Sequence, residues 1–265
     1  MGARPASEGG GYAVTEGRTP AEMAGLYEWP RVVAVTGALG SGKTEFVLNL
    51  ARGLKERGER VTIADADIIN PYFCIRQVAD QLEREGFTVL TPPEAAKWSD
   101  MSIVNPAISR AIVDENARLI LDIGGDAVGV RALTQFAPDL EAAGYRLLLV
   151  ANAFRPTTGS PEAIAKMRAK MEMLCGLEVG ALIANCHLME TTAAQDVAEG
   201  VRVVLEAGRR LNLPVLYATV LEELCGEVER LLGVDSVPIW PMVRYMQRPW
   251  EGESMWSAPV REKGA

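Results

Sequence analysis

The chain has 265 residues, of which 48% are hydrophobic and 23% charged, as in an ordinary globular protein. Its 27 Lys and Arg against 35 Asp and Glu leave a net charge of −8, which disfavours coating nucleic acid or an anionic membrane. No apolar run approaches the roughly 18–20 residues that span a bilayer, and the basic-then-apolar pattern of a signal peptide is absent. Four scattered cysteines without a CxxC motif disfavour a disulfide framework or a metal cage and predict a reducing, cytoplasmic environment.

In chain order, three parts are expected. Residues 1–29, rich in Gly, Ala and Glu, predict a loose arm, and residues 30–235 a single regular domain. Residues 236–265 predict a non-regular tail, since Pro breaks their periodicity and Trp is enriched there. The expected strands are 32–36, 61–64, 87–90, 119–123, 147–151, 181–184 and 214–217; the expected helices are 45–57, 72–85, 106–116, 161–174, 193–211 and 221–232. This alternation predicts an α/β fold, a mainly parallel sheet of about seven strands with helices on both faces.

The segment 37–44, GALGSGKT, matches the phosphate-binding pattern G-x-x-x-x-G-K-[ST] and lies between an expected strand and an expected helix. Glycines let successive backbone N–H groups turn toward phosphate oxygens, and the helix N-terminus adds positive potential. Lys43 supplies a full positive charge, and Thr44 a hydroxyl for Mg²⁺. The candidate nucleotide-binding residues of this P-loop are Gly37, Gly40, Ser41, Gly42, Lys43 and Thr44.

An acid followed by two glycines ends the expected strand 119–123. Asp122 therefore resembles the Walker-B carboxylate that holds Mg²⁺, although an Asp here also commonly caps the next segment. Gly124 and Gly125 would let the backbone approach the terminal phosphate of a nucleotide and move on hydrolysis.

A second pair of acids follows the strand 61–64. Asp65 and Asp67 alternate along an extended chain and so share a face. We expect one to position or deprotonate the attacking water and the other to support the Mg²⁺ shell. The alternative is a turn that caps the helix begun by Pro71.

These three pieces together resemble the CobQ/CobB/MinD/ParA-like group of P-loop proteins, over about residues 31–233, and most of all a little-studied set of bacterial ATP-binding proteins. The resemblance implies an ATP site of Lys43, Thr44, Asp67 and Asp122, with Asp67 as the water-positioning acid and Mg²⁺ as cofactor. It also implies a base-binding residue after a late strand, here Asn185, for which a turn asparagine is the alternative.

Arg155 follows another strand end, where ligands of open parallel sheets bind. It is a candidate contact for phosphate or an anionic substrate, with a surface ion pair equally open.

Two departures from the resembled groups bear on function. Ala38 stands where many ParA- and MinD-like proteins have the lysine that reaches across a nucleotide-sandwich dimer, so a homodimer is open but not supported. The loop also resembles that of metallochaperone GTPases, but residues 185–188 read Asn-Cys-His-Leu, without the Lys and Asp that those proteins use to read guanine. This favours ATP over GTP.

The leading hypothesis is a slow Mg²⁺-dependent ATPase that acts as a nucleotide switch or accessory protein. A small-molecule kinase or ATP-dependent ligase, similar to dethiobiotin synthase, is the first alternative, and a metallochaperone-type GTPase another. A nucleotide-holding scaffold that docks a protein partner through Trp240, Trp250 and Trp256 is also open.

Overall fold

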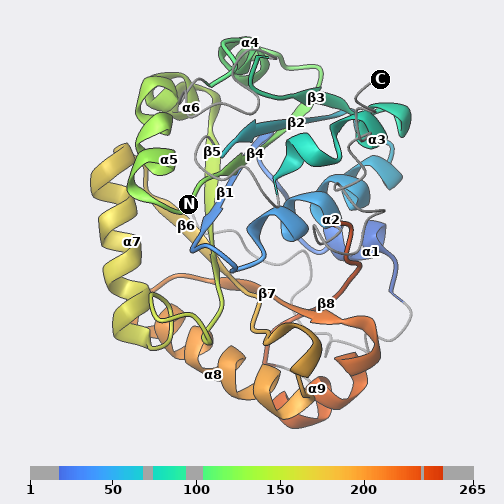
Figure 1. Cartoon of the computed structure of the whole chain (residues 1–265), viewed down its shortest axis with the longest axis vertical. Coiled ribbons are helices and arrows are strands. Elements are labelled where there is room, and N and C mark those ends of the chain that lie inside the picture. The colour runs from blue at the N-terminus through green and yellow to red at the C-terminus, as the bar shows by residue number, and fades with distance from the viewer. Residues whose placement is uncertain (1–17, 68–73, 94–103, 234–235, 247–265) are drawn as a thin grey trace, which may run out of the picture.

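A computed structural model of the chain describes residues 18–67, 74–93, 104–233 and 236–246. Within them, eight strands form one parallel sheet in the order β3-β2-β4-β1-β5-β6-β7-β8 (Figure 1). The strands are β1 (Val32–Gly37), β2 (Val61–Ala66), β3 (Thr88–Leu90), β4 (Arg118–Ile123), β5 (Tyr145–Ala151), β6 (Val179–Ala184), β7 (Val215–Leu221) and β8 (Ile239–Met242). The predicted α/β parallel sheet is confirmed, with eight strands against the seven expected.

Helices cover both faces of the sheet, as buried apolar strand residues require. They are α1 (Pro20–Ala24), α2 (Lys43–Glu56), α3 (Ala79–Arg84), α4 (Ala107–Val113), α5 (Ala127–Arg131), α6 (Ala137–Ala143), α7 (Pro161–Cys175), α8 (Ala194–Leu211) and α9 (Cys225–Leu232). Short 3₁₀ helices are η1 (Ile75–Gln77), η2 (Ala132–Phe136), η3 (Met189–Thr191) and η4 (Glu222–Leu224). None of the described helices is both long and apolar enough to cross a bilayer.

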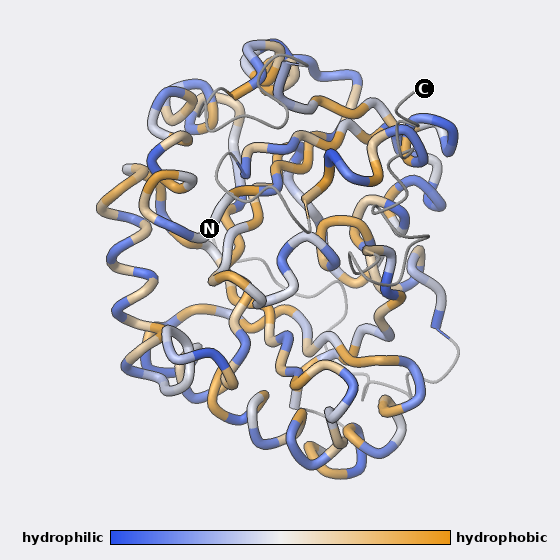
Figure 2. Tube along the Cα trace, in the orientation of Figure 1, coloured by the Kyte–Doolittle hydropathy of each residue, from blue (hydrophilic) through white to orange (hydrophobic). Residues whose placement is uncertain are grey.

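The sheet separates two hydrophobic cores. One packs α1, α2 and α3 against alternate strand residues such as Val33 and Val35; the other packs α4 to α9 against the opposite set, such as Val32 and Ala34. Figure 2 shows hydrophobic colour concentrated along the central strands and hydrophilic colour on the outward turns of the helices. Because both faces of the sheet are covered, the loops that follow the carboxyl ends of the strands are the part of the sheet that remains accessible to a ligand.

Residues 18–29 are not a loose arm. Thr19 begins α1 with a capping box: its backbone N–H donates to Glu22 Oε2 (2.8 Å) and its hydroxyl accepts from the Glu22 N–H. Met23 and Trp29 are then buried against α2 and the sheet. The T-x-x-E pattern with Pro20 at the first helical position is the signal that identifies this helix.

Residues 236–246 are not irregular either. Trp240 is fully buried in β8, within 4.8 Å of Tyr217 and 5.8 Å of Phe46 between ring centroids. Trp250 and Trp256 lie outside the described residues, as do residues 68–73 after Asp67. The predicted helix 72–85 is, where described, broken into η1 and α3.

Candidate nucleotide site

The candidate site lies where the strand order reverses. β1 pairs with β4 on one side and β5 on the other, so the loops that follow these three strands converge at the carboxyl edge. This is the switch point at which ligands bind in open α/β sheets. The P-loop leaves β1 there and enters α2 at Lys43.

Glycines shape the P-loop through close approach as well as backbone angle. Gly42 has φ +81°, and a methyl group on it would lie 2.0 Å from Asn185 Nδ2. Gly40 has φ +72° and lies under the guanidinium of Arg155, whose Nε donates to the Gly40 carbonyl (3.0 Å). Side chains from the loops after β6 and β5 therefore lie directly on the P-loop.

Four predicted residues come together beside the loop. Thr44 Oγ1 donates to Asp122 Oδ2 (2.7 Å), and Lys43 Nζ lies 2.9 Å from Asp67 Oδ2. All four are buried. The sequence prediction that Lys43, Thr44, Asp67 and Asp122 share one site agrees with this geometry.

The charges in this cluster perturb one another. Burial raises the pKa of Asp122 to about 7, although the positive charge of Lys43 opposes the rise. Burial disfavours the ammonium of Lys43, but Asp122 and Asp67 outweigh it and raise the pKa of Lys43 above its ordinary value. Asp122 Oδ1 and Ser41 Oγ are buried without a hydrogen-bond partner among the described residues. Such atoms are costly unless a ligand satisfies them.

Asp65 does not reach this cluster. Its carboxylate is fully buried and pairs with Arg76 (Nε to Oδ2, 2.8 Å), while Oδ1 accepts the backbone N–H of Asp67 (3.1 Å). The expectation that Asp65 supports the Mg²⁺ shell is wrong, because Arg76 occupies it. Asp65 instead positions Asp67 through the backbone.

Gly125 packs on the P-loop. A methyl group at this position would lie 1.8 Å from the carbonyl oxygen of Gly37, and one at Gly124 would lie 2.9 Å from Asp67 Oδ1. The loop after β4 therefore contacts both the P-loop backbone and the water-positioning candidate.

The Asn185 side chain forms hydrogen bonds with both the P-loop and β7. Its Nδ2 donates to the Ser41 carbonyl (2.7 Å), and its Oδ1 accepts from Thr219 Oγ1 of β7 (2.8 Å). These two bonds tie the loop after β6 to the P-loop and to β7. Among the described residues, the second N–H of Nδ2 and the second lone pair of Oδ1 have no hydrogen-bond partner.

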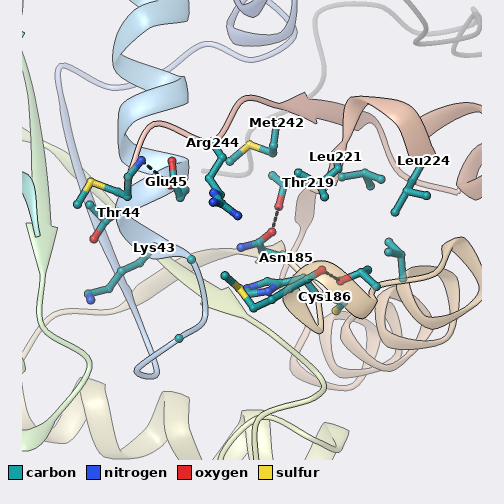
Figure 3. A pocket seen from close by; sticks show the side chains of 18 of the residues that line it. Lys43, Thr44, Glu45, Asn185, Cys186, Thr219, Leu221, Leu224, Met242 and Arg244 are labelled. Atoms are coloured by element: carbon teal, nitrogen blue, oxygen red, sulfur yellow. Dashed lines mark hydrogen bonds between the residues drawn. The ribbon is translucent and has the colours of Figure 1, made fainter. Parts of the chain in front are cut away.

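A cavity of about 1090 Å³ opens beside Asn185 (Figure 3). Its walls come from the P-loop, from the loop after β6, from the end of β7, and from residues 242–246. A nucleotide base and ribose fit such a volume. The Arg244 side chain extends into the cavity from the segment after β8, and its Nη1 lies 3.4 Å from Glu190 Oε1.

The cavity wall formed by residues 242–246 is not predicted by any motif in the sequence. Residues 243–246, the C-terminal strap, are held on α2: Asn49 exchanges hydrogen bonds with the Val243 backbone (2.8 and 3.1 Å). The Glu45 carboxylate accepts the N–H groups of Tyr245 and Met246, both at 2.9 Å. No local sequence pattern signals these contacts.

Comparisons with known proteins support the fold. No protein-family model and no curated protein matches the chain. Among solved structures, the cell division protein FtsY of Thermotoga maritima is 21% identical, with a TM-score of 0.54 over 78% of this chain and 69% of its own. The signal recognition particle receptor FtsY of Elizabethkingia anophelis, in complex with GDP, is 19% identical (TM-score 0.50; 77% and 64%). FtsY of Mycoplasma mycoides is 17% identical (TM-score 0.50; 83% and 72%).

The chain has the α/β fold of P-loop NTPases. It spans about two thirds of the length of these FtsY chains. At such identities the likeness concerns the fold alone, and it does not single out the CobQ/CobB/MinD/ParA-like group that the motifs resemble.

Proposed function

We propose that the chain is a Mg²⁺-dependent nucleoside triphosphatase that binds ATP and acts as a slow nucleotide switch or accessory protein. The observation that carries this proposal is the P-loop with Thr44 on Asp122 and Lys43 on Asp67. A P-loop alone supports phosphate binding, but the two added carboxylates supply the groups that hydrolysis requires.

The residues present fit Mg²⁺. Thr44 Oγ1 and the Asp122 carboxylate are oxygen donors of the kind that this ion prefers, and Asp122 Oδ1 is buried without a partner among the described residues. Thr44 and Asp122 would hold the ion, with Asp67 nearby. When bound, Mg²⁺ neutralises charge on the phosphates.

Residues of the chain itself bind the phosphates and position the attacking water. Backbone N–H groups of residues 37–44 bind phosphate oxygens, and the Lys43 ammonium exchanges its ion pair with Asp67 for one with the terminal phosphate. Asp67, released from Lys43, then orients the attacking water and accepts its proton. Arg155, resting on Gly40, adds a guanidinium for phosphate at the loop tip.

A switch follows from the packing of Gly124 and Gly125. The loop after β4 contacts Asp67 and the P-loop backbone, so ligand-dependent motion of either passes into that loop and α5. Order that depends on the terminal phosphate is how nucleotide switches signal.

Residues 185–188, Asn-Cys-His-Leu, lack the Lys and Asp that metallochaperone GTPases use to read guanine, which supports ATP; the carboxylates of the cavity wall allow a test of this choice. Guanine offers an N2 amino donor that a carboxylate accepts, whereas adenine lacks it. Glu45 is engaged by the strap and Glu190 by Arg244, which leaves Glu223 as the guanine-reading candidate among the described residues of the cavity wall. Because one FtsY neighbour binds GDP, GTP is the competing nucleotide. Glu223→Gln should leave ATP affinity unchanged; a selective loss of GTP affinity would favour the GTPase alternative.

The test is steady-state phosphate release from ATP and GTP with Mg²⁺, paired with fluorescent-nucleotide affinity. Lys43→Ala should abolish binding, and Asp67→Ala should abolish turnover but retain binding. Asp80→Ala, which removes an exposed acid from α3, is the matched control. Wild-type affinity in Lys43→Ala, or wild-type turnover in Asp67→Ala, would contradict the proposal.

A further inference from the structure

A second cavity, of about 450 Å³, lies between the loops that follow β4 and β5. It shares none of its lining residues with the nucleotide cavity. Gly125 and Asp126 form one side, Thr157 and Ser160 another, and residues of α5 and α7 complete it. Cavities of this size hold small metabolites.

The cavity adjoins the phosphate end of the nucleotide site. β4 and β5 flank β1, so the P-loop runs between the loops that form the cavity. Gly125, in the cavity wall, packs directly against Gly37. Asn185 and the nucleotide cavity of about 1090 Å³ lie beyond β5, on the other side of the P-loop.

Two lysines and two acids line this cavity: Lys166, Lys170, Asp126 and Glu162. Lys166 and Lys170 are exposed, one helical turn apart on α7, and neither forms an ion pair with the described residues. Like charges at this spacing repel, and an anion between them would relieve the repulsion.

The acids at the cavity are already engaged. Glu162 pairs with Arg210 of α8, and Asp126 Oδ1 accepts the N–H groups that begin α5. Within the part of the chain that the structure describes, neither acid forms an ion pair with Lys166 or Lys170.

Apolar side chains complete the cavity. Val130 of α5 and Met171 of α7 are buried, while Met167 and Leu174 are half-buried in its wall. A ligand that suits both parts has an anionic head for the lysines and a short apolar body.

We propose that this cavity binds a small carboxylate with an apolar chain, placed beside the phosphate end of the nucleotide. Binding itself rests on the cavity alone; only its placement as a second substrate or activator rests on the proposed function. Lys166 and Lys170 bind the carboxylate, and the α5–α7 wall binds the chain.

The probe is octanoate, titrated into the full chain with ¹³C-methyl methionine and compared with 1-octanol, which has the same chain length without charge. Octanoate should shift the methyl signals of Met167 and Met171, assigned by Met→Leu variants. Lys166→Gln combined with Lys170→Gln should weaken octanoate binding about tenfold, the equivalent of one charge-assisted contact, and leave octanol binding unchanged. Arg84→Gln, which removes an exposed charge from α3, is the control.

Equal octanoate affinity in the double-lysine variant, or shifts confined to Met242 and Met246 of the nucleotide cavity, would overturn the proposal. Fluorescent-ATP binding is measured on the same samples. If wild type binds octanoate at α7 but no nucleotide, the proposed function fails and this site stands.

Discussion

Gly125→Ala tests whether the loop after β4 and the P-loop form one rigid unit. The added methyl group would lie 1.8 Å from the Gly37 carbonyl oxygen, 2.6 Å from its carbon and 3.1 Å from the Ala38 nitrogen. All three atoms are backbone, so no side chain can rotate away. The loop or the P-loop must shift.

The expected cost lies at the upper end of overpacking, about 3 kcal/mol of unfolding free energy. For a domain of this size, that corresponds to a fall in Tm of about 6–12 °C. Nucleotide affinity should fall as well, because the displaced atoms belong to the first residues of the P-loop.

Gly180→Ala is the matched control. Gly180 lies in β6 with ordinary backbone angles, and a methyl group there meets nothing nearer than Arg146 Cγ at 3.4 Å. Thermal melts and fluorescent-nucleotide titration of both variants decide the matter. If Gly125→Ala melts and binds as Gly180→Ala does, the packing argument for a coupled switch loop is refuted.

Three further predictions concern buried charge. Asp65→Asn and Arg76→Met should each cost about 3 kcal/mol or more in denaturant unfolding, and the double variant less than their sum. His187, the only histidine, has a pKa lowered by burial to about 4, so the folded chain holds it neutral and stability falls as pH drops from 6.5 toward 4, by as much as about 3 kcal/mol. NMR titration of the tag-free protein should show no imidazole transition near 6.5. Glu45→Gln keeps one acceptor oxygen of two, so hydrogen exchange should quicken about tenfold at whichever of the Tyr245 and Met246 amides loses its acceptor.

Much of the site could be predicted because its parts are local patterns at strand ends. GKT after an apolar strand, and an acid closing another, each describe a short segment. The parallel sheet brings the ends of β1, β2 and β4 to one edge, so Lys43, Asp67 and Asp122 meet without further information.

The remainder depends on contacts between distant segments. Asn49 and Val243 are 194 residues apart, and their bonds use backbone groups that any residue would supply. β8 contains Pro241, which indicates a strand break. The sheet tolerates it because β8 is the edge strand of the described sheet, where one side of the strand pairs with no other described strand. Asp65 was misassigned because spacing alone does not reveal Arg76 as its partner.

The place of Trp240 changes how a role of the C-terminal tail must be tested. Deleting residues 236–265 would remove β8 and the strap, and with them a wall of the base cavity, so loss of any activity would say nothing about a docking partner. A truncation after Met246 preserves Trp240, Tyr245 and the Glu45 contacts. We expect that truncation to keep the wild-type Tm and nucleotide affinity, because every described contact of the strap remains. A fall in Tm of several degrees would instead assign residues 247–265 a structural role and remove the reason to seek a partner for them.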